Sequence, residues 1–143
     1  MPTVHFPRKL RNDFSAQARD AFPSETFAVC LGDPGPSGSY SILALYYPPI
    51  KLDPDGRGFQ VPPMIWGFAQ RLASATKLSL VATLHSHPYP EDYNTDDASP
   101  SETDLDFLCS DLPMGICSVV QDNEELTCRY RFWPKIPKVK ITQ

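Results

Sequence analysis

The stretch LSLVATLHSHPYPEDYNTDDASPSETD, residues 78–104, decides the fold and holds the densest set of chemically useful side chains in the sequence. Its first part, residues 78–84, is a short apolar run typical of a buried strand. This strand continues into His85-Ser86-His87. Side chains alternate between the two faces of a strand, so both imidazoles are expected on one face, close enough to share a single ion. The segment therefore predicts a strand that ends in two candidate metal ligands.

Apolar periodicity on either side of this segment predicts the other elements. Leu10, Phe14 and Ala18 recur at helical spacing, and Pro23 ends the run. The remaining elements expected are strands at 26–31 and 40–47 forming an antiparallel hairpin, a loop at 50–61, a helix from 62–63, a helix from Ser101, and strands at 115–120 and 126–133. The helix from 62–63 is expected to bury one face, made of Ile65, Phe68, Ala69, Leu72 and Ala75. The order predicts an α/β fold, a mixed β-sheet flanked by helices, in a single domain over residues 1–143.

Composition excludes several classes of function. The 143 residues are 41% hydrophobic and carry a net charge of -4, so no basic surface favours nucleic acid as a partner. The longest strongly apolar stretch, residues 42–47, is too short to span a membrane, and the N-terminus has no apolar signal-peptide core. The four cysteines show no CxxC spacing, and Cys30, Cys117 and Cys128 lie in apolar or alternating runs typical of buried free thiols. A reduced, cytoplasmic compartment is expected, although four cysteines would also allow two disulfides in a secreted protein.

Two histidines need a third ligand to make a catalytic metal site. Asp104 is a candidate, because it falls in the first turn of the helix expected from Ser101. Three protein ligands of this type leave a fourth position of a zinc ion open for water, which the metal acidifies. Each motif also has a simpler interpretation: an isolated HxH pair need bind no metal, and Ser101 to Asp104 also fits a capping box that only starts a helix.

The order HxHP followed by PSxxD resembles the hallmark of the JAMM (MPN+) zinc metalloproteases, of the bacterial stand-alone type. That family also has a glutamate on a short element after the first helix, and this chain has Glu25 there, after Phe22-Pro23-Ser24. Two features depart from the pattern. Phe27-Ala28 stands where bacterial members tend to have Cys-Gly, and residues 88–100 make the gap between the motifs longer than is usual in the family.

The resemblance implies an MPN fold, which is cytidine-deaminase-like, and one catalytic Zn²⁺ ion. Carried over residue by residue, it assigns His85, His87 and Asp104 as the zinc ligands. It assigns Glu25 as the general base that takes a proton from the water and passes it to the leaving amine. Ser101 matches the residue that hydrogen-bonds the developing oxyanion. Each role suits the chemistry of the side chain.

Other alignments of the S-x-x-D motif with this sequence stay open. Ser99 followed by Glu102 also fits S-x-x-acid, and Asp96 or Asp97 are alternative ligands. Ser101 and Asp104 are preferred, because a proline precedes them and an apolar helix face follows. The acidic loop 88–100 is either a solvated segment or a lip that contacts substrate.

The resemblance further implies hydrolysis of the peptide or isopeptide bond after the C-terminal tail of a ubiquitin-like protein, by deconjugation or by precursor processing. The partners expected are that protein or its conjugate and, as for bacterial members in antiviral operons, E1- and E2-like conjugation enzymes. Three alternatives remain. They are a catalytically silent MPN scaffold, a processing peptidase of a sulfur-carrier protein, and a zinc hydrolase acting on small amides.

Overall fold

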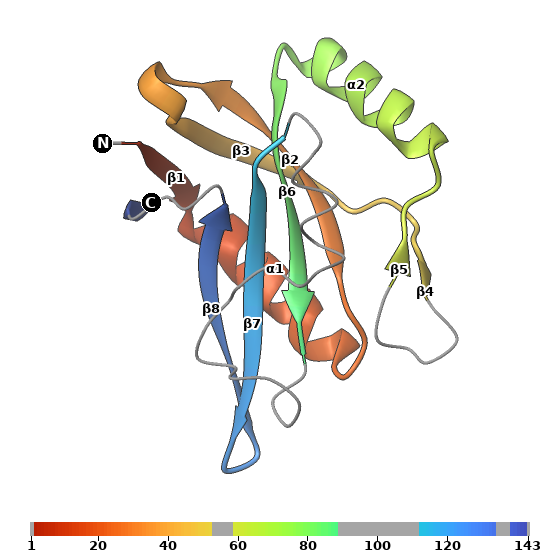
Figure 1. The fold of residues 1–143 in the computed structure, drawn as a ribbon, viewed down its shortest axis with the longest axis vertical. Coiled ribbons are helices and arrows are strands. Elements are labelled where there is room, and N and C mark those ends of the chain that lie inside the picture. Colours follow the sequence, from red (N-terminus) through yellow and green to blue (C-terminus); the bar gives the residue numbers. More distant parts are fainter. Residues whose placement is uncertain (1, 53–58, 89–111, 134–137, 143) are drawn as a thin grey trace.

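The structure, a computed structural model, describes residues 2–52, 59–88, 112–133 and 138–142. Seven strands form one sheet in the order β8-β7-β6-β2-β3-β1-β9, and β4 and β5 form a separate pair beside it (Figure 1). In chain order the elements are β1 (Thr3–Pro7), α1 (Arg8–Ala21), β2 (Phe27–Pro34), the 3₁₀ turn η1 (Pro36–Gly38), β3 (Tyr40–Tyr46), β4 (Lys51–Leu52), β5 (Phe59–Gln60), α2 (Met64–Thr76), β6 (Ser79–His87), β7 (Met114–Asp122), β8 (Glu125–Trp133) and β9 (Lys138–Thr142).

The predicted α/β architecture, a mixed sheet flanked by helices, is confirmed. β2 pairs antiparallel with both β3 and β6, whereas β6 and β7 run parallel. The predicted hairpin of β2 and β3 is present, and the strands predicted at 115–120 and 126–133 pair antiparallel as β7 and β8. The strand β1 and the short pair β4–β5 are not predicted from the sequence, because strands of two to five residues give too little periodicity. The helix expected from Ser101 lies outside the described residues.

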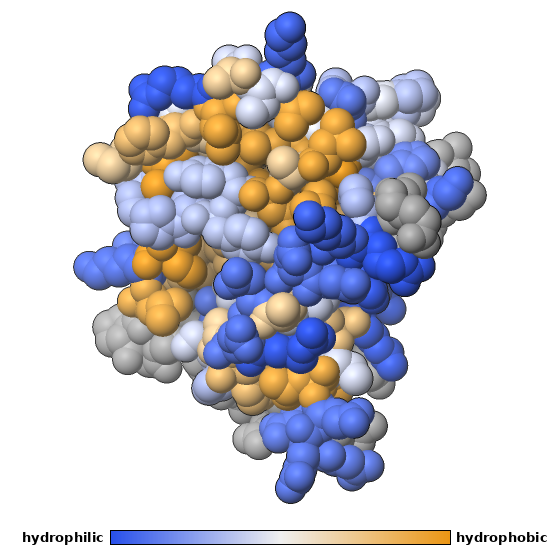
Figure 2. All heavy atoms as spheres, turned by 180° about the vertical axis from the view of Figure 1, so that it is seen from behind, coloured by the Kyte–Doolittle hydropathy of each residue, from blue (hydrophilic) through white to orange (hydrophobic). Residues whose placement is uncertain are grey.

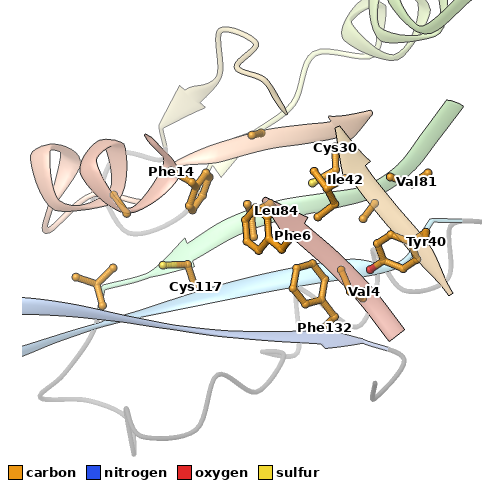
Figure 3. Packing of buried hydrophobic residues seen from close by; sticks show 14 residues of the cluster. Val4, Phe6, Phe14, Cys30, Tyr40, Ile42, Val81, Leu84, Cys117 and Phe132 are labelled. Carbon is orange, nitrogen blue, oxygen red and sulfur yellow. The ribbon is translucent and has the colours of Figure 1, made fainter. Parts of the chain in front are cut away.

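The main core lies between α1 and one face of the sheet. Phe14 and Ala18 of α1 are buried there, and Figure 3 shows Phe14 directed at the layer that contains Leu84 and Phe6. The same cluster includes Cys30 of β2, the strand that pairs with β6. In Figure 1 α1 passes behind β6 and β7, and the view from that side shows hydrophilic side chains across the middle of this face (Figure 2). The helix is therefore amphipathic, as its sequence spacing predicts.

The second helix packs on the opposite face of the sheet, through a smaller cluster. Ala69 contacts Phe27 and Val29, which alternate along β2 with residues of the main core. The expected apolar face of α2 is partly wrong: Ile65, Ala69 and Ala73 are buried, whereas the side chains of Phe68 and Leu72 are 49% and 39% exposed. Burial follows the i, i+4, i+8 stripe, because a single helix lying at the end of the sheet contacts it along a narrow line.

The cysteines of the described residues agree with the expectation of free thiols. Cys30 and Cys117 are buried free thiols, and Cys128 is a partly buried free thiol. Cys109 lies outside the described residues. Of the helices that the structure describes, none combines the length and apolar character needed to cross a membrane.

Candidate metal centre

The two histidines occupy the end of the central strand β6. Because they are two residues apart, they lie on the same face, and their Nε2 atoms are 3.1 Å apart. The His85 side chain is only 3% exposed, and His87 is partly buried. Two imidazoles that meet through their Nε2 atoms in a buried position make a stiff pair of potential ligands. The sequence prediction that one strand presents both rings on one face is confirmed.

Glu25 reaches this pair from the segment between α1 and β2. Phe27 lies opposite His85 in the antiparallel pairing of β2 with β6. One step further along, the N–H of Ser86 donates to the carbonyl oxygen of Thr26 over 2.9 Å. Glu25 directly precedes Thr26 in the chain and so lies one residue beyond this hydrogen bond. One ligand atom from each of Glu25, His85 and His87 lies within 4.8 Å of the other two.

This cluster has the donor chemistry of a metal site. Within the part of the chain that the structure describes, it is the one group of three or more His, Cys, Asp or Glu side chains close enough to hold an ion. Two nitrogen ligands at 2.0–2.1 Å from a tetrahedral zinc ion lie roughly 3.3 Å apart. The Nε2 atoms of His85 and His87, 3.1 Å apart, are close to that separation. The pair therefore fits a zinc ion.

Aromatic side chains enclose one side of the His85 ring. Phe59 of β5 meets it at 6.0 Å between ring centroids and 62° between ring planes. Phe59 contacts Phe27, which in turn packs edge-to-face against Trp66 of α2. These contacts cover one side of the imidazole ring and limit its rotation. Phe59 is not predicted as a site residue from the sequence, since it lies in a stretch expected to be loop.

The neighbouring strand β7 adds a buried hydroxyl on the same side. In the parallel pairing of β6 with β7, Ser118 is the register partner of His87, and Ile116 is that of His85. The Ser118 side chain is only 2% exposed. Ser118 is not predicted as a site residue either, although a serine inside the apolar run GICSVV is the kind of signal that could have indicated it.

Two of the five predicted site residues lie outside the described residues. These are Ser101, the expected oxyanion donor, and Asp104, the expected third ligand, together with the alternatives Asp96, Asp97, Ser99 and Glu102. The structure thus brings together Glu25, His85 and His87. The roles of all five residues stay predictions.

A second, partly buried polar cluster lies on the opposite face of the sheet, between α1 and the strands β7 and β8. Ser15 Oγ of α1 is 2.7 Å from the hydroxyl of Tyr130, which donates to the carbonyl oxygen of Arg11 over 3.1 Å. The Cys128 Sγ lies 4.0 Å from the Ser15 carbonyl oxygen. A hydrogen bond from the Cys117 thiol lowers the pKa of Cys128 to about 6, whereas burial raises that of Cys117. This cluster joins α1 to the sheet and contains no part of the predicted metal site.

Comparison with known proteins agrees with this geometry. The family model for prokaryotic homologues of the JAB domain matches residues 7–134. That range includes Glu25, both histidines, and the positions of Ser101 and Asp104. No curated protein sequence matches the chain.

Three solved structures share the fold. A protein from Desulfitobacterium hafniense aligns with a TM-score of 0.73 and 18% identity, covering 98% of this chain and 93% of the other. A protein from Salinibacter ruber aligns with a TM-score of 0.61 and 20% identity, covering 100% and 91%. A JAB1/MPN domain protein from Archaeoglobus fulgidus aligns over 100% of both chains, with a TM-score of 0.56 and 19% identity. At these identities the similarity concerns the fold alone.

Proposed function

Because the chain belongs to the family of prokaryotic homologues of the JAB domain, we propose that it is a zinc-dependent metallopeptidase. The observation that carries this proposal is the convergence of Glu25, His85 and His87 at the end of β6. The family includes members without catalytic activity. A buried pair of imidazoles with a carboxylate beside it favours an active member, since a pure scaffold has no need for three metal-binding side chains at one point.

His85, His87 and Asp104 would hold the ion, with the two imidazoles fixed by their place on a central strand. When bound, zinc supplies an acidified water as nucleophile and a Lewis acid for the scissile carbonyl. The aromatic ring of Phe59, which contacts Phe27, covers one side of the His85 imidazole and limits its rotation.

Glu25 and Ser101 would perform the proton and charge chemistry. The Glu25 carboxylate takes a proton from the attacking water and returns it to the leaving amine, a role that typically contributes about 10²–10⁴-fold. The Ser101 hydroxyl donates to the oxygen on which negative charge develops, a contribution on the order of 2.7–4 kcal/mol. Neither residue needs to bind the metal for these roles.

The substrate we propose is the C-terminal tail of a ubiquitin-like protein, either joined to a lysine or extended as a precursor. The support is the resemblance of the motifs to the JAMM peptidases. An extended tail can bind beside an exposed strand, which presents its last carbonyl to the site. E1- and E2-like enzymes would be functional partners if the protein acts within a bacterial conjugation system, and a sulfur carrier would be the substrate if it does not.

The test uses the zinc-loaded protein and two substrates. One is a ubiquitin-like protein with a C-terminal peptide extension, and the other has the same tail linked to a lysine side chain; products are identified by mass spectrometry. We expect a cut directly after the tail in at least one of them, lost in Glu25→Gln. Zinc binding without cleavage of either substrate would identify a silent scaffold, and cleavage of small amides alone would identify a different hydrolase.

A further inference from the structure

The segment that carries Glu25 is fastened to β6 at one point, between the two histidines. The Ser86 N–H donates to the Thr26 carbonyl oxygen over 2.9 Å. The Thr26 N–H donates in return to the Ser86 Oγ over 2.8 Å. We call these two hydrogen bonds the Thr26–Ser86 clasp. β2 itself begins at Phe27, so the clasp lies just beyond the regular strand.

The hydroxyl of Ser86 takes the place of a backbone acceptor. In a hydrogen-bonded antiparallel pair, two opposite residues exchange both N–H···O=C bonds. Here Thr26 accepts the first bond in the usual way, but its own N–H is bound by a side chain. An alanine at position 86 would leave that partly buried N–H without its present partner, which weakens the attachment of this segment to β6. The clasp thus depends on a hydroxyl at this position.

Both residues of the clasp are direct neighbours of the candidate metal centre. Ser86 lies between His85 and His87, and Thr26 follows Glu25. Ser86 is fully buried, and alternation along β6 directs its side chain away from the face that carries the imidazoles. Within the described residues, its hydroxyl reaches the segment that carries Glu25 through the backbone N–H of Thr26.

We infer that Ser86 is a positioning residue, which holds the Glu25 carboxylate in reach of the two histidines. This inference rests on the proposed function, since it gives Glu25 the role of general base. A general base works within about 2.6–3.2 Å of the proton that it takes. A misplacement of about 1 Å costs roughly 100-fold in rate. A clasp at the next residue fixes the backbone from which the Glu25 side chain extends and so limits where its carboxylate can lie.

The test compares Ser86→Ala with Ser86→Thr, which keeps the hydroxyl and suits a strand. We expect Ser86→Ala to bind one equivalent of zinc but to lose about 10- to 100-fold in kcat with little change in KM. Ser86→Thr restores turnover. In a Glu25→Gln background, Ser86→Ala causes no further loss. A loss of equal size in that background, or unchanged turnover of Ser86→Ala, would overturn the inference.

Ser15→Ala is the matched control, because it removes another buried serine hydroxyl on the same side of the sheet, one that contacts Tyr130 and not the segment that carries Glu25. It is expected to lower stability without changing kcat. A loss of kcat in Ser15→Ala as large as in Ser86→Ala would mean that the effect is merely one of stability, which contradicts a positioning role.

A readout that needs no substrate separates this inference from the proposed function. In protein labelled with ¹³C and ¹⁵N, the Thr26 amide is expected to exchange slowly in the wild type and in Ser86→Thr, and much faster in Ser86→Ala. The change in the Glu25 carboxyl resonance on adding zinc is expected to be smaller in Ser86→Ala. If both changes appear while no ubiquitin-like substrate is cut, the positioning holds and the proposed substrate is wrong. If neither appears, the positioning role is refuted.

Discussion

The two faces of the sheet near the end of β6 both bury polar side chains, but in different ways. On the α1 face, the hydroxyls of Ser15 and Tyr130 bond each other and a backbone carbonyl of the helix. On the other face, Glu25, His85 and His87 converge through atoms that bind metals. In the first arrangement the polar groups bond one another and connect helix α1 to the sheet. The second gathers ligand atoms around a point, which is the pattern of a site rather than of a structural network.

The sharpest test of this contrast is removal of one imidazole. We expect His85→Ala to lose zinc, measured by metal analysis and by titration, together with all turnover. Loss of an outer partner of a ligand lowers metal affinity by about 10–100-fold, so loss of a ligand itself should exceed about 100-fold. Cys128→Ala, on the opposite face, is the control and should keep one equivalent. If His85→Ala retained zinc at wild-type affinity, the contrast between the faces would fail.

The second test asks whether Glu25 belongs to the chemistry or to the ligand set. We expect Glu25→Gln to keep its zinc and its fold and to lose about 10²–10⁴-fold in kcat, since the amide cannot carry the proton. Steady-state kinetics on a tail-extended ubiquitin-like substrate, with metal analysis of the same preparation, would measure this. Loss of zinc together with activity would instead make Glu25 a ligand.

The site is predictable from sequence to the extent that its residues are local. His85 and His87 share a face because strand periodicity requires it, and the apolar run before them defines the strand. Glu25 is sixty residues from His85 along the chain, and only the pairing of β2 with β6 brings them together. The family resemblance predicts the place of Glu25 in the site, whereas no local sequence pattern does.

The parts of the fold that were not predicted share a physical reason. β1 pairs in parallel with β3 and β9, which lie far from it in sequence, so its five residues carry no hairpin signal. Phe59 reaches His85 from a two-residue strand that composition assigns to a loop. The Thr26–Ser86 clasp depends on one hydroxyl in a tertiary contact. In each case long-range packing decided the outcome, whereas α1 followed from its helical periodicity and β6 from its apolar run.

A third test concerns the thiols of the α1 face. The hydrogen bond from Cys117 and the charge of Arg19 lower the pKa of Cys128 to about 6. Above pH 6 this thiol is therefore mainly thiolate; at pH 7 the thiolate fraction is about 30-fold higher than for a cysteine of pKa about 8.5. We expect iodoacetamide to label Cys128 before Cys30 and Cys117, with a midpoint near pH 6, as followed by peptide mass spectrometry. Labelling that rises only above pH 8 would contradict this.

The smallest expected effect belongs to the hydroxyl that ties α1 to the sheet. Tyr130→Phe removes the hydrogen bonds to Ser15 and to the Arg11 carbonyl, but keeps the ring packed edge-on against Phe6 at 5.3 Å. We expect a loss of about 1–2 kcal/mol in the free energy of unfolding, measured by urea denaturation, with unchanged zinc content.

Tyr130→Leu is the companion variant, because it removes the aromatic contacts as well and should destabilise the protein further. Burial raises the pKa of Tyr130 above its ordinary value, so the hydroxyl itself stays protonated between pH 6 and 8. A loss of zinc in Tyr130→Phe would mean that the two faces are coupled. The α1-face network would then be a support of the metal centre rather than a separate part of the core.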